Sequence, residues 1–189
     1  EPLTPTCILE MLSHQNFNDM LLAYDPQFKF DMARSIYKTI VKFIATQYRR
    51  NYVIQPLPVN NFSIAINEKK RTATLTWNPV NDPLEPTAKA KEYIVYTRLG
   101  YQDFDNGTIV RGNSFTTELH TDMPYSFRVA AVNDGGESFP SETLSCGISS
   151  KSRGTILIMN GFTRLEGPKA INTSTRAGFD IETDPGVPY

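Results

Sequence analysis

Glu10 is the residue best placed for catalysis. The apolar residues Cys7, Ile8 and Leu9 lead into this carboxylate, and polar residues 13–16 follow it. A carboxylate at the end of a buried strand can act as a general acid or base, because burial and a nearby cation or metal tune its pKa for proton transfer. A lone Glu at a strand end is also a common solvated or capping residue, so both interpretations stay open.

Aromatic side chains near strand ends and turns form a second candidate site. Exposed rings in such places can stack on the faces of sugars, which predicts a carbohydrate-binding surface. The candidate residues are Tyr96, Tyr101 and Phe104, with Phe139 as a further ring. Alternatively, these rings pack on neighbouring domains or fill the interior of their own domain.

The histidines and cysteines do not form a metal site, because none has a second His or Cys at ligand spacing. We expect His14 to be a loop residue that could line a cleft, and His120 to be a surface turn residue. Cys7 and Cys146 lie in different apolar stretches and predict two buried thiols, although a disulfide between them stays open. We therefore expect no cofactor in this chain.

The charge balance excludes two classes of partner. The 189 residues contain 19 Lys and Arg against 20 Asp and Glu, a formal net charge of -1. Nucleic acids and anionic membranes attract basic surfaces, which this balance does not provide. No apolar run approaches the roughly 18 residues of a membrane-spanning helix. We expect a soluble fragment of a longer protein, since the first residue is not Met.

A long amphipathic helix must follow the loop after Glu10. Asp25 is a suitable N-cap, and Pro26 fits the first helical position, where its missing N–H costs nothing. The apolar stripe recurs every four residues and consists of Phe28, Met32, Ile36, Ile40 and Ile44. Such a stripe needs cover from a sheet or a second helix.

The pattern then changes to period two. Phe62, Ile64 and Ile66 alternate with polar residues, and turn residues separate this run from the next ones. About seven short strands in about ninety residues predict an antiparallel sandwich. We expect a mainly β fold with an N-terminal strand, a long helix and a C-terminal strand of the α/β type at residues 155–159, buried on both faces.

Residues 57–148 resemble a fibronectin type III domain, an immunoglobulin-like sandwich. Tyr125 matches the tyrosine corner of that family, and Trp77 with Pro79 matches its second strand. The C-terminal part of the resemblance is carried by Leu119, Tyr125, Phe127, Val129, Ala131, Asn133, Gly136, Ser138 and Ser141. The resemblance implies that Trp77 is a core residue.

Residues 5–46 resemble the C-terminal part of the zinc-dependent N-acetylmuramoyl-L-alanine amidases. The matching motifs are residues 7–16, Asp19, and Ala33 to Tyr37 in the helix. The resemblance implies that Glu10 is the catalytic carboxylate, which assists a zinc-bound water in cleaving the amide between muramoyl sugar and peptide. It also implies that zinc belongs only to the full-length amidase-like domain, because that family's ligands lie upstream, so this chain alone should be inactive.

The last residues resemble the start of a xanthan lyase-like module, through residues 160–162, 177–180 and 186–189. The predicted organisation is thus an amidase-like strand and helix at 1–50, a linker at 51–57, the sandwich at 58–148 and a third domain from 149 to 189.

We expect a fragment of a secreted, periplasmic or cell-surface bacterial enzyme that degrades peptidoglycan or a related polysaccharide. In this interpretation the sandwich is a spacer or interaction module, and its partners are neighbouring domains of the same chain. The alternative is a non-catalytic adhesion module that binds a glycan or a protein.

Overall fold

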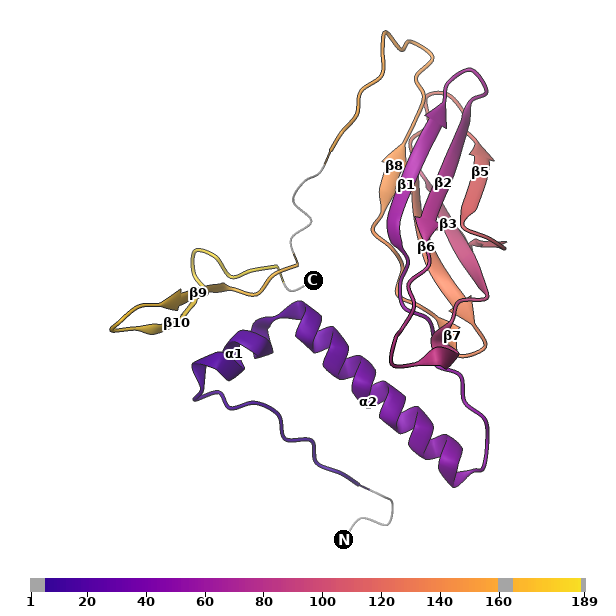
Figure 1. The fold of residues 1–189 in the computed structure, drawn as a ribbon. Helices are drawn as coiled ribbons and strands as arrows, with labels where there is room; N and C mark the ends of the chain where they lie inside the picture. The colour runs from indigo at the N-terminus through magenta and orange to yellow at the C-terminus, as the bar shows by residue number, and fades with distance from the viewer. Residues whose placement is uncertain (1–5, 160–164, 188–189) are drawn as a thin grey trace. The chain divides into compact units, whose positions relative to one another are not determined.

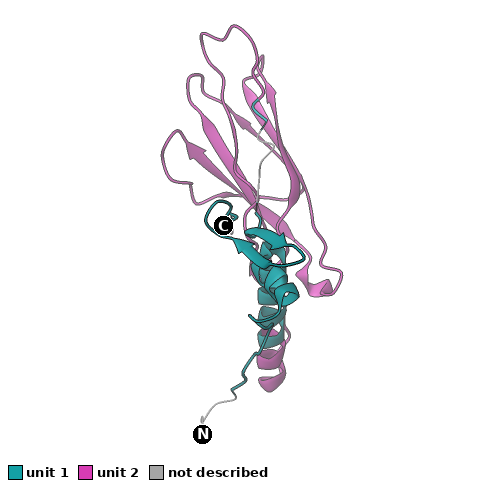
Figure 2. Cartoon of the chain, turned by 90° about the vertical axis from the view of Figure 1, so that its left-hand side faces the viewer, with its two compact units in different colours: residues 1–40, 158–189 teal, residues 41–157 magenta. Residues whose placement is uncertain are grey.

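The computed structural model describes residues 6–159 and 165–187. The chain forms two compact units, one of residues 1–40 and 158–189 and the other of residues 41–157 (Figure 2).

The second unit contains two antiparallel sheets that pack face to face (Figure 1). The first sheet has the order β1-β2-β5, with β1 at Asn60–Asn67, β2 at Thr72–Asn78 and β5 at Ser114–Glu118. The second sheet has the order β4-β3-β6-β7, and β8 also pairs with β6. Its strands are β3 at Glu92–Leu99, β4 at Thr108–Val110, β6 at Tyr125–Asn133, β7 at Gly136–Glu137 and β8 at Leu144–Cys146. A short 3-10 helix, η1, spans Pro86–Ala88.

The core lies between the two sheets, because alternate residues of each strand point inward. Trp77 is buried, as predicted, and its ring packs edge-on against Tyr93 at 5.3 Å between centroids. The largest fully buried side chains are Trp77, Phe127, Ile54, Leu75, Val95, Val129 and Pro56. The Tyr125 hydroxyl accepts a hydrogen bond of 3.2 Å from the His120 backbone N–H, which confirms the predicted tyrosine corner.

Beside β6, the side chains of two serines accept hydrogen bonds that a neighbouring strand would otherwise accept. Residues 138–143 separate β7 from β8, and Pro140 among them has no N–H to donate. The Ser138 hydroxyl accepts from the Ala131 N–H at 2.9 Å, and the Ser141 hydroxyl accepts from the Val129 N–H at 3.0 Å. Both serines are buried, so these bonds satisfy backbone donors that would otherwise lie unpaired in the interior.

The long helix α2 spans Pro26–Gln47. Its start is as predicted, because the Asp25 carboxylate accepts from the Gln27 N–H at 2.8 Å and caps the first turn. The last turns belong to the second unit, where Lys42 Nζ lies 2.7 Å from Glu85 Oε2 and Ala45 is buried.

The first unit consists of α1 at Phe17–Tyr24, most of α2, and a hairpin of β9 at Lys169–Asn172 and β10 at Ala177–Asp180. The rings of Phe17 and Tyr24 contact the ring of Phe179 at 5.5 and 4.7 Å. The sequence predicts only a loop between Glu10 and the long helix, whereas the structure forms α1 there, capped by the side-chain oxygen of Asn16.

Two predicted strands are absent from the described residues, and both predictions are wrong. Residues 7–9 and 155–159 have no regular structure, and Ile8 and Ile156 are 85% and 86% exposed. A strand needs a hydrogen-bonding neighbour, and no described segment pairs with either run. The expected motif at residues 160–162 and the end of the chain at 188–189 lie outside the described residues.

The thiols are both free. Cys146 is half-buried, and this burial raises the pKa of its thiol to about 11. Cys7 is exposed, which corrects the expectation that both thiols are buried. Its segment has no sheet to cover it among the described residues.

Candidate functional site

Glu10 lies in the extended segment before α1 and is exposed to solvent. Two hydrogen bonds order the loop after it: the Ser13 N–H donates to the Asp19 carboxylate at 2.8 Å, and the Asn16 side chain accepts from the Asn18 N–H at 2.9 Å. His14 of this loop borders an open apolar hollow of about 490 Å³, as expected for a residue that lines a cleft. Glu10 does not border that hollow, and its catalytic role stays a prediction.

The described residues of this chain do not offer a zinc site. No group of three or more His, Cys, Asp or Glu among residues 6–159 and 165–187 could hold a metal ion. His120 is exposed in the segment between β5 and β6, as predicted for a surface residue. In the same described ranges, no helix is long and apolar enough to span a membrane.

The outer face of the second sheet carries two of the predicted aromatic residues. Tyr96 on β3 faces Arg128 on β6 in the strand register. The Arg128 guanidinium lies 5.1 Å from the Tyr96 ring centroid and 4.2 Å from that of Phe104. The Arg98 guanidinium lies 5.0 Å from the same Phe104 ring. We call Tyr96, Arg98, Phe104 and Arg128 the Arg–aromatic cluster.

Phe104 reaches this face because the loop that carries it folds back onto β3. The Asp105 carboxylate accepts from the Thr97 and Gly107 N–H groups, both at 2.9 Å, and the Asp105 N–H donates to the Thr97 carbonyl at 2.9 Å. A Cβ on Gly107 would lie 2.2 Å from Ile94 Cγ2, so only glycine fits there.

The Tyr96 hydroxyl donates a hydrogen bond of 2.6 Å to Glu137 Oε1. This bond raises the pKa of Tyr96 to about 12, because ionisation would remove the donated proton and place a second negative charge beside the carboxylate. Of the other predicted rings, Tyr101 is fully exposed and Phe139 is 63% exposed. The structure therefore brings Tyr96 and Phe104 together and leaves Tyr101 outside the cluster.

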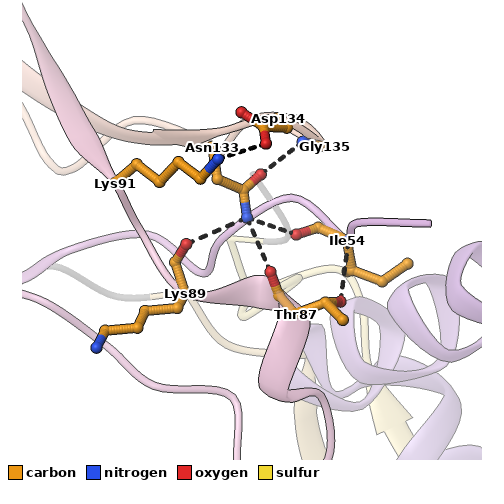
Figure 3. A network of polar contacts seen from close by, with 7 residues as sticks. All are labelled: Ile54, Thr87, Lys89, Lys91, Asn133, Asp134 and Gly135. Carbon is orange, nitrogen blue, oxygen red and sulfur yellow. Dashed lines mark hydrogen bonds and ion pairs between the residues drawn. The ribbon is translucent and has the colours of Figure 1, made fainter. Parts of the chain in front are cut away.

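A second polar arrangement fixes the segment that enters the sandwich (Figure 3). The buried side-chain amide of Asn133 donates toward the carbonyls of Ile54, Thr87 and Lys89 at 2.9, 3.2 and 3.2 Å. Its oxygen accepts from the Gly135 N–H at 2.8 Å. We call this set of bonds the entry clamp.

The entry clamp is close-packed. A Cβ on Gly135 would lie 2.4 Å from the Val53 carbonyl oxygen, so the hairpin approaches the incoming chain without room for a side chain. The exposed ion pair of Lys91 with Asp134 lies beside the clamp (Figure 3).

The exit from the sandwich has its own clamp around Asp122. Its carboxylate accepts from the Ser150 N–H at 3.0 Å and the Ser150 hydroxyl at 2.5 Å, and the Asp122 N–H donates to the Ile148 carbonyl at 2.7 Å. These bonds, the side-chain bond from Ser150 first, hold the pKa of Asp122 below its usual value. We call them the exit clamp.

Sequence reasoning missed the two arginines and both clamps. Arg98 and Arg128 alternate with core residues along β3 and β6, which places both on the outer face of the sheet. This alternation is the sequence pattern that could have identified them. Asn133 carried part of the family resemblance, but its three acceptors come from distant segments and give no local pattern.

The comparisons with known proteins concern the sandwich. No curated protein matches this chain. Similar solved structures include the twitchin kinase region of C. elegans, at 23% identity over 53% of this chain and 18% of that one, with a TM-score of 0.44. Titin kinase with its flanking domains matches at 24% identity over 52% of this chain and 18% of that one, with a TM-score of 0.44.

The fourth fibronectin type III domain of a human protein matches at 21% identity over 53% of this chain and 85% of that one, also with a TM-score of 0.44. The family model of the fibronectin type III domain matches residues 57–147. This match agrees with the two-sheet topology, the buried Trp77 and the hydrogen bond of Tyr125. Residues 57–147 therefore form a fibronectin type III domain, a module of the kind found in multidomain proteins.

Proposed function

We propose that this fibronectin type III domain is a stiff spacer in a secreted bacterial enzyme of several domains that acts on cell-wall or related polysaccharides. The observation that supports the spacer role is that the sandwich binds the chain at both of its ends. The entry clamp fixes residues 53–55, and the exit clamp fixes residues 148–150. A spacer with anchored ends holds its flanking segments in a defined direction, unlike a flexible Gly/Ser-type tether.

The spacer role is tested by NMR relaxation of the backbone amides. We expect order parameters near 0.85 at residues 53–55 and 148–150, as in β6, where a flexible tether would give values below about 0.6. Asn133→Ala should lower the values at the entry only, and Asp122→Ala those at the exit only, so each variant is the control for the other. Values below about 0.6 at both ends of the unchanged chain would contradict the proposal.

We further propose that residues 5–46 belong to an amidase-like domain in which Glu10 is the acid/base carboxylate. The proposal is supported by the motifs of residues 7–16 and 33–37, and by the capped loop that holds His14 beside α2. The half-exposed apolar side chains of α2, Ile40 and Ile44, are also consistent with a helix that packs on a sheet.

The enzymatic proposal is tested with the natural protein that contains this chain, by release of peptides from purified peptidoglycan. Replacement of Glu10 by Gln should lower the rate by on the order of a hundredfold or more, the scale of a lost acid/base group. Glu142→Gln, an exposed Glu in the sandwich, is the matched control and should leave the rate unchanged. An undiminished rate in Glu10→Gln rules out the role given to Glu10.

A further inference from the structure

We propose that the outer face of β3 and β6 binds the carboxylates of an acidic, uronate-containing polysaccharide through the Arg–aromatic cluster. The observation is that two guanidiniums are held on aromatic rings without a carboxylate partner among the described residues. This binding role is separate from the spacer role, and either can fail without the other.

Arg128 is fixed but unpaired. Its guanidinium contacts the rings of Tyr96 and Phe104, and it forms no hydrogen bond or ion pair with any residue that the structure describes. Its Nε atom is also shielded from solvent without a partner. Ring contacts use the face of a guanidinium, whereas its N–H donors lie in its plane, so the terminal N–H donors, unlike the shielded Nε, stay available to a ligand.

Arg98 supplies a second cation against the same Phe104 ring. One of its nitrogens donates to the Ser126 hydroxyl at 3.2 Å, and that hydroxyl lies 2.9 Å from the Ser145 hydroxyl. The Arg98 Nε is likewise buried without a hydrogen bond. The terminal nitrogens of the two guanidiniums carry further N–H donors, which can receive planar carboxylates in the fork geometry that distinguishes Arg from Lys.

The two nearby carboxylates do not neutralise these arginines. Glu137 accepts the Tyr96 hydroxyl, and Asp105 holds the loop to β3. Neither forms an ion pair with Arg98 or Arg128 in the described structure. Their bonds position the rings on which the guanidiniums lie, so they support the site and leave its positive charges unpaired.

The surface favours an acidic glycan over a neutral glycan or a peptide. Arginine contacts occupy the rings of Tyr96 and Phe104, which argues against simple sugar stacking on them, while Tyr101 on the same loop presents an open ring. The edge strand β4 has only 3 residues, too few to pair with an added peptide strand. Residues 57–148 carry eight Lys and Arg against eleven Asp and Glu, so general attraction of anions is weak and local geometry must select the ligand.

The test is affinity electrophoresis of the full chain in gels that contain polygalacturonate, with dextran, dextran sulfate and polyglutamate as the other polymers. We expect polygalacturonate to retard the chain most strongly. Arg128→Lys keeps the charge but loses the planar fork, and it should weaken binding about tenfold, the scale of one charge-assisted hydrogen bond. The double variant Arg98→Gln/Arg128→Gln should abolish binding of polygalacturonate. The control Arg111→Gln changes a 90% exposed side chain outside the cluster and should leave binding unchanged.

Three outcomes would overturn the proposal. The first is no retardation by polygalacturonate. The second is equal retardation by dextran sulfate or polyglutamate, which would indicate an unspecific anion effect or a peptide ligand. The third is unchanged binding in Arg128→Lys. The near-ultraviolet circular dichroism spectrum of each variant shows whether the sandwich is folded, so loss of binding is not confused with loss of structure.

Discussion

The two units differ in how they bury their apolar side chains. The sandwich places Trp77, Phe127 and Leu75 in a closed core. In the first unit none of the described large apolar side chains is fully buried, and its hairpin and helices meet through the rings of Phe17 and Phe179. Both units contain apolar residues, so they differ in how many layers of secondary structure cover those residues.

This contrast teaches that an amphipathic pattern predicts which face of a helix or strand needs to be buried, but not which segment covers that face. In the sandwich each strand finds its neighbour within the same ninety or so residues, because antiparallel strands need only short connections. The stripe of α2 and the run at residues 155–159 have the right residue types but no second layer among the described residues. A two-stranded hairpin such as β9 and β10 is marginally stable by itself, so it cannot supply that layer.

The largest expected effect tests whether the two units unfold independently of each other. Phe127→Ala should lower the free energy of unfolding of the sandwich by about 3–5 kcal/mol, because it leaves a cavity in a closed core. The single Trp of the chain is Trp77, so its fluorescence during urea unfolding reports the sandwich alone. Phe28→Ala on the stripe of α2 should leave this transition unchanged. Equal shifts in both variants would show that the two units unfold together.

A smaller effect tests whether the entry clamp belongs to the sandwich. Asn133→Ala leaves the buried Ile54 carbonyl without this donor and should cost about 1–3 kcal/mol in the same urea experiment. Asp134→Ala removes only the exposed ion pair with Lys91 and should cost less than about 1 kcal/mol. The reverse order of the two variants would contradict the role given to Asn133.

The smallest effect is the pH dependence of the exit clamp. The pKa of Asp122 is lowered in the folded state, so its contribution is present above the unfolded value near 3.8 and is lost as the pH falls through the lowered pKa. We expect the difference in stability between the unchanged chain and Asp122→Ala to be largest at neutral pH and to shrink in acid. A difference that is constant from pH 7 to pH 2 would exclude this linkage.

The sequence could predict what depends on local pattern. The strands of the sandwich, the burial of Trp77 and the Asp25 cap all follow from periodicity and capping chemistry. The site depends on contacts between distant residues: Tyr96 meets Arg128 only through the register of β3 with β6, and Asn133 meets Ile54 only in the folded domain. The role of Glu10 stays a prediction, because none of the described residues forms a hydrogen bond or ion pair with its side chain and it does not border the apolar hollow.

The interruption between β7 and β8 also bears on how such chains behave at high concentration. These two strands form one edge of the second sheet, and the break at Pro140 leaves pieces of 2 and 3 residues. A continuous edge would present a row of unpaired N–H and C=O groups to any other chain. Ser138 and Ser141 keep the inner side of this edge bonded, while its outer side is too short to template pairing. This edge of the second sheet therefore offers another copy of the domain no continuous strand to pair with.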